Sequence, residues 1–125
     1  MSYAQRHVVD ITTIADQSGE GYTPPVTGKL IDIQYIKDDF TNGVDFTVSG
    51  EDTGRQFWRQ DNVDASAVVA PRQPTHDYTG TASLYAGQGE PVEDYFVLDN
   101  ERIKVAVATG GASKGGQFLI TVAGP

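Results

Sequence analysis

Hydrophobic and polar residues alternate along most of the chain, and the clearest alternation lies within residues 29–50. Residues 44–49 alternate strictly between apolar and polar side chains, which is the period-two pattern of a half-buried β-strand. Residues 30–36 repeat the pattern. The segment between them ends in Asn42-Gly43, a dipeptide that tolerates positive φ and reverses the chain at low cost. The pattern therefore predicts a β-hairpin around which the domain is organised.

The same alternation recurs in short segments separated by turn residues, while no segment repeats the helical period over ten residues. Residues 16–21 are predicted to be a turn. The last two apolar segments flank a glycine-rich loop and predict a second hairpin. The sequence thus indicates one all-β domain over residues 1–125, an antiparallel Ig-like or jelly-roll-like β-sandwich of about eight strands. Besides the central hairpin, we expect strands at residues 6–14, 56–60, 66–70, 92–99, 102–108 and 118–123.

Two segments fall outside the strand pattern. Residues 1–6 are polar and are predicted to form an N-terminal arm. Residues 71–91 contain three prolines and three glycines with few apolar side chains, so we expect one long irregular loop. Long loops in compact domains are usually functional or flexible. This loop is therefore the main candidate for contact with a partner.

Charge and composition narrow the choice of partner. Acidic residues number 17 against 9 basic residues, a formal net charge of −8, which disfavours nucleic-acid binding because phosphates repel such a surface. No apolar run is long enough to cross a membrane, and the first residues lack the apolar region of a secretory signal. The absence of cysteine excludes disulfides and thiolate chemistry. We expect synthesis in a cytoplasm and no nucleic-acid or membrane partner.

Catalytic and metal-binding motifs are not evident in the sequence. The loop 110–116 carries Lys114 but differs from a P-loop in spacing and in leading into a strand. The aspartates near the predicted turns do not follow the EF-hand pattern. His7 and His76 are the only side chains that ordinarily titrate near neutrality, and neither accompanies a nucleophile elbow or a zinc helix. We predict a protein that is not an enzyme and needs no cofactor or metal.

Five stretches of the sequence are considered together. They are VDIT from residue 9, PPVTGKLIDIQYIKDDFTNGVDFTVSGEDTG from residue 24, APRQPTHDYTGTASLY from residue 70, LDNERIKVAVATGG from residue 98 and GQFLITVAG from residue 116. In this combination, and over nearly its whole length, the chain resembles a family of small virion structural proteins of tailed bacteriophages, encoded near the major capsid gene.

The resemblance implies a head decoration (cement) protein that binds the major capsid protein on the virion surface and forms a homo-oligomer, a trimer or a dimer. A head–tail joining or tail component is the second interpretation. A carbohydrate-binding module, with Trp58, Tyr78 or Tyr85 stacking on sugar rings, is the alternative from another class. For Trp58 a place in the core is favoured over a place in an interface. The residues expected to contact partners come from the arm, the irregular loop and the tryptophan: Ser2, Tyr3, Gln5, Arg6, Trp58, Arg72, His76, Tyr78 and Tyr85.

Overall fold

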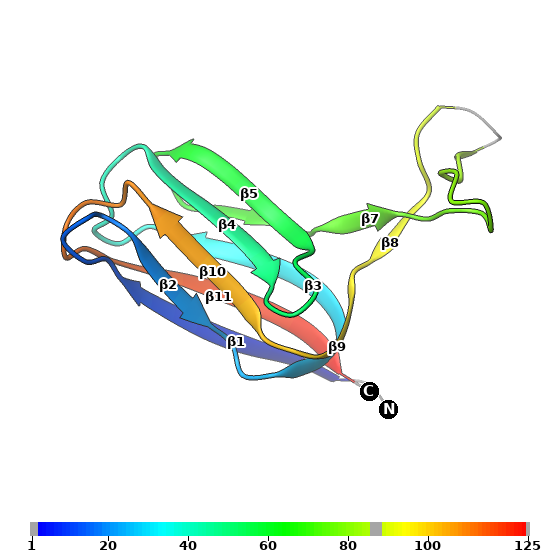
Figure 1. Cartoon of the computed structure of the whole chain (residues 1–125), viewed down its shortest axis with the longest axis horizontal. Coiled ribbons are helices and arrows are strands. Elements are labelled where there is room, and N and C mark those ends of the chain that lie inside the picture. Colours follow the sequence, from blue (N-terminus) through cyan, green and yellow to red (C-terminus); the bar gives the residue numbers. More distant parts are fainter. Residues whose placement is uncertain (1–2, 86–88, 125) are drawn as a thin grey trace.

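The computed structural model describes residues 3–85 and 89–124, and this part of the chain contains β-strands and no α-helix (Figure 1). The expectation of an all-β domain is confirmed. The strands are β1 (Tyr3–Thr12), β2 (Gly19–Tyr22), β3 (Val26–Ile36), β4 (Val44–Gly50), β5 (Gln56–Val63), β6 (Ala67–Val69), β7 (Arg72–Pro74), β8 (Glu93–Tyr95), β9 (Val97–Glu101), β10 (Ile103–Ala108) and β11 (Gly115–Gly124).

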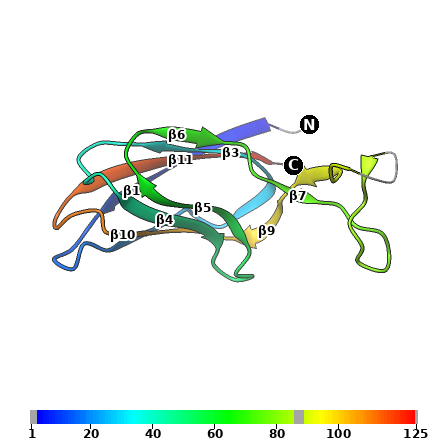
Figure 2. The ribbon, with the colours of Figure 1, turned by 90° about the horizontal axis from the view of Figure 1, so that it is seen from above.

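Two antiparallel sheets face each other and form the predicted β-sandwich (Figure 2). One sheet has five strands in the order β1-β11-β3-β6, with β9 also pairing with β3. The other has four strands in the order β2-β10-β4-β5. In β4 and β10 every second side chain is buried, as the alternation predicts. The inner faces of the two sheets therefore supply one continuous core.

Aromatic side chains occupy the centre of this core. The ring of Tyr35 lies 5.1 Å from that of Phe46 and 5.1 Å from that of Phe118, and all three residues are almost completely buried. Trp58 meets Phe46 edge-on at 4.7 Å, and its indole N–H donates to Gln60 Oε1 at 3.0 Å. Edge-to-face packing of this kind adds to the free energy gained by burial. The cluster joins strands of both sheets.

The two predicted hairpins are wrong, although their strands are correct. β3 belongs to the five-stranded sheet and β4 to the four-stranded sheet, so residues 37–43 cross between the sheets. β10 and β11 are likewise in different sheets. Phe40, in the first crossing, is buried at the end of the sandwich and lies under Gly116, where a Cβ would be 2.1 Å from its ring. Burial of Phe40 explains why the chain arches over the core instead of turning tightly.

The predicted arm (residues 1–6) is also corrected for residues 3–6, the part of it that the structure describes. Tyr3 to Arg6 form the beginning of β1 and pair with Gly124 to Thr121 of β11. β1 therefore starts before the predicted boundary at residue 6. Within this strand His7 shares the inward face of Val9, because side chains alternate along β1.

Residues 19–21, predicted to belong to a turn, form the short strand β2 together with Tyr22. Gly21 lies directly over Val9, where a Cβ would be 2.5 Å from its side chain, and Gly19 lies similarly over Ile11. Glycine is thus required for β2 to approach β1 across the core. Because these glycines bury no side chain of their own, the alternation that identifies other strands is missing here.

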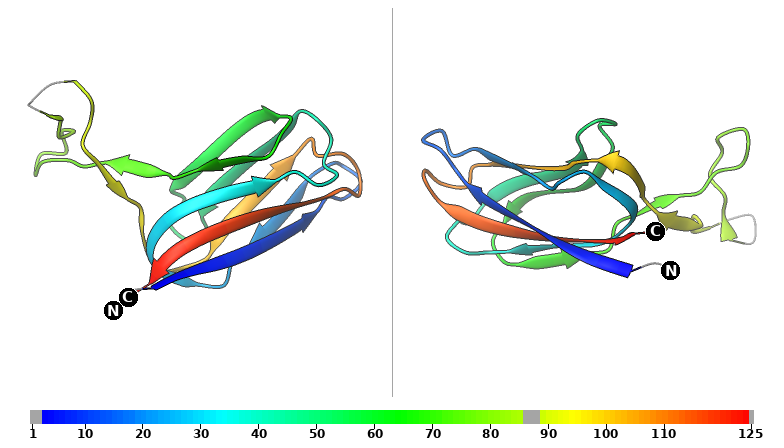
Figure 3. Two further views of the ribbon diagram at one scale, coloured as in Figure 1. Left: turned by 180° about the vertical axis from the view of Figure 1, so that it is seen from behind. Right: turned by 90° about the horizontal axis from the view of Figure 1, so that it is seen from below.

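The start of the predicted irregular loop (71–91) and the start of the predicted strand (92–99) pair with each other as a two-stranded ribbon. β7 pairs with β8 through residues 72–74 and 93–95, and the chain between them extends away from the sandwich (Figures 1 and 2). We use the name ribbon for residues 72–95 throughout. The start of β1 and the end of β11 lie at the same end of the sandwich as the ribbon (Figure 3).

Candidate partner-binding surface

The root of the ribbon is fixed to the sandwich by aromatic and cationic side chains. The guanidinium of Arg72 lies over the ring of Tyr95 at 4.0 Å and donates to the backbone carbonyl of Ile31 at 3.1 Å. Phe96, which follows β8, packs edge-on against Phe57 at 4.8 Å. Arg72 and Tyr95 face each other within the ribbon, so the bond to Ile31 and the contact with Phe57 are what restrict the direction in which the ribbon leaves the sheet. The ribbon therefore projects as a braced element.

Backbone hydrogen bonds continue beyond the two short strands. Thr75 N–H donates to Val92 O at 2.8 Å, and Ser83 N–H donates to Thr75 O at 2.9 Å. Val92 N–H in turn donates to Ser83 O at 2.8 Å. The segment around Ser83 thus folds back between the two sides of the ribbon. This arrangement satisfies backbone groups that an irregular loop would leave to solvent.

At the outer turn of the ribbon, Asp77 organises the backbone that carries Tyr78. Its Oδ1 accepts hydrogen bonds from Thr79 N–H at 2.8 Å and from Thr81 N–H at 3.2 Å, and also from the Thr79 hydroxyl. The Thr79 hydroxyl and amide hold the pKa of the Asp77 carboxyl below its usual range. Tyr78 itself is 100% exposed. The turn therefore presents a large aromatic side chain fully to solvent.

Substituting Asp77 with alanine should loosen this turn without unfolding the sandwich. Loss of the carboxylate removes the shared acceptor of Thr79 and Thr81, so their amide NMR signals should shift toward random-coil positions at neutral pH. Because the pKa of Asp77 is lowered in the folded chain, the same shift should appear in the unsubstituted protein only as the pH falls below about 4. Asp77→Asn retains a side-chain acceptor and should keep most of the native signals. Unchanged signals in Asp77→Ala would contradict this role.

The residues predicted to contact partners fall into separate places. Arg72, His76, Tyr78 and Tyr85 lie on the ribbon, although Arg72 is engaged at its root. Tyr3, Gln5 and Arg6 lie in β1, where all three are exposed. Ser2 lies outside the described residues. The described candidate residues therefore lie on the ribbon, in β1 and, for Trp58, in β5.

Trp58 is only 8% exposed and belongs to the core. This position agrees with the interpretation favoured from the sequence, a place in the core. The inclusion of Trp58 among the residues expected to contact partners is corrected. Burial also removes it as a stacking platform for a sugar ring, which needs an exposed aromatic face. Adjacent Phe57 is buried as well, because the pairing register shifts between Val48 and Ser49 of β4 and places both aromatic side chains inward.

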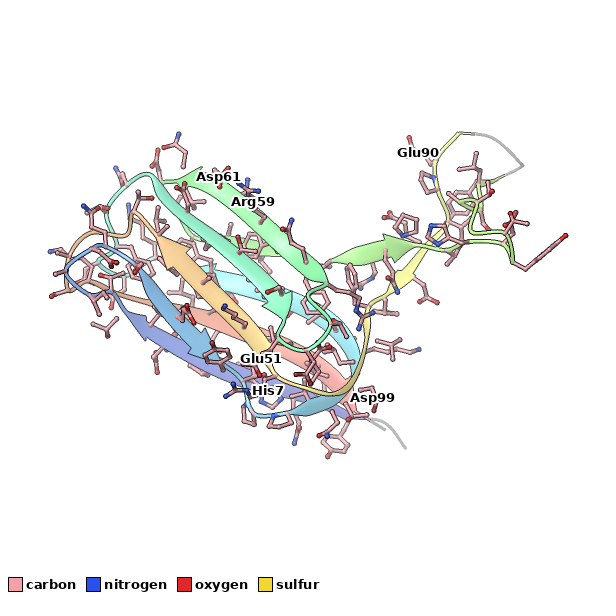
Figure 4. All side chains as sticks on the ribbon, viewed as in Figure 1. His7, Glu51, Arg59, Asp61, Glu90 and Asp99 are labelled. Atoms are coloured by element: carbon pink, nitrogen blue, oxygen red, sulfur yellow. The ribbon has the colours of Figure 1, made fainter. Side chains whose placement is uncertain are left out.

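The two histidines do not form a joint site. Figure 4 shows His7 on the sandwich and Glu90 on the distant ribbon, which also carries His76. His7 Nε2 is buried and has no hydrogen-bond partner among the described residues, while His76 is exposed beside Asp77. Within residues 3–85 and 89–124, no three His, Asp or Glu side chains gather in a way that could hold a metal ion. No helix of this part of the chain could span a membrane.

One buried carboxylate was missed by sequence reasoning. Glu101 is 2% exposed at the end of β9, and its Oε2 accepts from Thr53 N–H at 2.7 Å and from the Thr53 hydroxyl at 2.9 Å. Arg55 lies 3.9 Å from its other oxygen. A Cβ on Gly50 would be 2.5 Å from this carboxylate. These contacts attach the turn after β4 to β9, so the role of Glu101 is structural.

Open depressions on the surface are shallow. One of about 350 Å³ is lined by parts of β3, β9 and β11, including Gly28 and Leu98, and lies at the ribbon end of the sandwich. Another of about 330 Å³ is lined by Asp10, Lys37 and Asp38 among others. Neither contains a histidine. The features best suited to contact with a macromolecule are therefore convex.

No protein-family model and no curated protein sequence matches the chain. Among solved structures, the chain is similar to a crystal structure of FlhE, with a TM-score of 0.41 and 8% sequence identity. The match covers 95% of this chain and 96% of that chain. A likeness this distant does not identify a function.

Proposed function

We propose that this protein is a virion structural protein of a tailed bacteriophage that decorates the capsid by binding the major capsid protein. The observation that carries the proposal is the braced ribbon, whose outer turn displays Tyr78 completely to solvent. A projecting element with a preorganised turn loses little conformational entropy when a partner binds it. The sequence resemblance to small phage virion proteins gives the class of partner.

Adhesion in this proposal comes from the ribbon and from charge. Besides Arg72, the ribbon carries four carboxylates, those of Asp77, Glu90, Glu93 and Asp94. Such a surface is complementary to a basic patch on the capsid, and Tyr78 supplies an aromatic anchor of the type that dominates many interfaces. Many copies around one shell would multiply a modest affinity. The protein then acts through shape, with no bond made or broken in a substrate.

Removing the exposed aromatic ring tests the proposal. Purified protein mixed with expanded, undecorated capsids should sediment with them, and Tyr78→Ala should weaken this binding at least about tenfold. Tyr22→Ala, which removes a tyrosine from β2 on the sandwich, is the matched control and should bind normally. Equal binding of Tyr78→Ala and the unsubstituted protein would reject the ribbon as the contact.

The same mixing experiment separates the alternatives. Binding confined to tail tubes or portal vertices would favour a head–tail joining or tail protein. Binding to a glycan array that is lost in Tyr78→Ala or Tyr85→Ala would favour the carbohydrate-binding alternative. If the protein binds none of capsids, tails or glycans, all three proposed classes of partner are wrong. This conclusion does not depend on whether the ribbon is ordered.

A further inference from the structure

β1 is a long and regular outer strand of the five-stranded sheet. It pairs with β11 through ten consecutive residue pairs without a register shift, and it has no partner strand on its other side within the described part of the chain. Figure 3 shows β1 along the margin of the sheet. An open edge of this length is a template for pairing with another strand.

The backbone groups that point outward can be identified from the ladder. Thr13 N–H donates to Lys114 O at 2.8 Å, which continues the register of β1 with β11. Bonded and non-bonded pairs alternate in an antiparallel ladder. The odd-numbered residues of β1 therefore bond to β11, and Arg6, Val8 and Asp10 direct their N–H and C=O groups to the open side.

The side chains of these three residues are self-complementary. All are exposed, and Val8 is 51% exposed. If two β1 strands pair antiparallel about Val8, each Val8 meets its own copy, each Arg6 faces the other chain's Asp10, and each Asp10 faces the other chain's Arg6. Opposite charges on directly facing residues stabilise a sheet, and like charges destabilise it. Shifting the pairing by two residues in either direction removes the match, so the charges specify this register.

We propose that two copies of this chain associate through antiparallel pairing of their β1 edges, with a two-fold axis at Val8. Arg6 is available for this contact, because it forms no ion pair within residues 3–85 and 89–124. Asp10 accepts one hydrogen bond, from Gln117 Nε2 at 2.9 Å, and a carboxylate can accept several. The interface is isologous, as most homodimer interfaces are.

The other edges are less suitable for a second copy. β5 is the outer strand of the four-stranded sheet, but its pairing with β4 shifts register twice, and Asn62 has a positive φ of 57°. Such irregularities twist an edge away from further pairing. Arg59 and Asp61 of β5 also lie 3.6 Å apart within the same chain (Figure 4). The open edges of β2, β6 and β9 extend over only four, three and five residues.

Charge reversal and its compensation test the dimer without reference to any capsid. Sedimentation of the unsubstituted protein at tens to hundreds of micromolar should show a monomer–dimer equilibrium. Arg6→Asp alone, or Asp10→Arg alone, places like charges in both symmetric pairs and should weaken dimerisation about tenfold. The double variant Arg6→Asp/Asp10→Arg restores opposite charges and should recover the dimer. A monomer at all these concentrations, or no recovery in the double variant, overturns the proposal.

Disulfide cross-linking tests the same β1–β1 pairing and does not depend on the stability of the fold. The chain has no cysteine, so Val8→Cys introduces a single thiol that meets its own copy at the axis. Facing Cα atoms of a bonded antiparallel pair are about 5.5 Å apart, within the range that a disulfide spans. Oxidation should yield a disulfide-linked dimer. Val68→Cys, on the exposed face of β6, is the control and should remain unlinked; equal linking of both variants overturns the proposal.

The proposed dimer does not depend on capsid decoration. If the protein does decorate capsids, however, the dimer determines how its two ribbons are placed. The N-terminal end of β1 lies at the end of the sandwich from which the ribbon projects (Figures 1 and 3). Antiparallel pairing places these ends on opposite sides of the two-fold axis. The two ribbons therefore project from opposite ends of the dimer. A failure of the sedimentation test removes the dimer and leaves the capsid-binding test of Tyr78→Ala unaffected.

Discussion

Replacing Phe46 with alanine should lower the free energy of unfolding by about 3–5 kcal/mol. Phe46 is 2% exposed and lies at the centre of the aromatic cluster, with ring centroids at 5.1 Å from Tyr35, 5.0 Å from Phe118 and 4.7 Å from Trp58. Truncation to a methyl group leaves a cavity that strands from both sheets cannot close together. The midpoint of thermal unfolding should fall by about 10–20 °C.

Thermal and urea unfolding followed by circular dichroism measure this effect. Phe46→Leu keeps much of the buried volume and should cost considerably less than Phe46→Ala. Val68→Ala removes apolar atoms from a side chain that is 63% exposed and should change stability by no more than about 0.5 kcal/mol. A Phe46→Ala protein as stable as Val68→Ala would mean that the two sheets do not share this cluster.

The strands could be predicted because their inner positions obey a local rule. In residues 44–50 every second side chain is buried, and the same alternation marks β10 and β11. Leu30 shows where the rule fails. Its partner is Val122, whereas Asp32 faces Thr121, so Ile31 is an extra residue that shifts the face of the strand. A bulge of this kind leaves no clear mark in the pattern of apolar residues.

The pairing of the strands could not be read from the same pattern. A strand–turn–strand segment shows the same alternation of apolar and polar residues in two different arrangements. Its strands can pair side by side in one sheet, or they can face each other across the core in two sheets. Phe40 distinguishes the two cases, because a buried aromatic residue in the connection needs the space over the end of the sandwich. Asn42-Gly43 does form a turn, with Gly43 at a φ of 87°, but the turn serves a crossing between sheets.

The sequence indicates which residues form the candidate contact surface, but it does not indicate how they fold. Prolines and glycines at residues 71–91 indicate a departure from the sandwich, and exposed Tyr78 and Tyr85 lie within it. The brace between Arg72 and Tyr95 joins residues far apart in sequence, so only the fold brings it together. Asp77 could have been recognised, because an aspartate with Thr and Gly two and three positions later is typical of a turn.

The second large effect is expected at Gly28, where β3 meets both β11 and β9. Its φ is +137°, and a Cβ at this position would lie 2.1 Å from the backbone oxygen of Ala123. Gly28→Ala therefore combines a backbone conformation that other residues rarely adopt with a clash against main chain, which cannot rotate away. We expect a loss of about 3–5 kcal/mol in the free energy of unfolding, measured by urea denaturation.

Gly54→Ala separates the two contributions to this loss. Gly54 also has a positive φ, +73°, but nothing lies within 4 Å of the Cβ that alanine would add. Its substitution should therefore cost only the conformational part, about 1–2 kcal/mol. The excess at Gly28 then measures how rigidly β11 holds Ala123 against β3. If both variants lose the same stability, β11 moves aside freely; if Gly28→Ala loses more, close packing of this glycine fixes the sheet from which β9 and the ribbon extend.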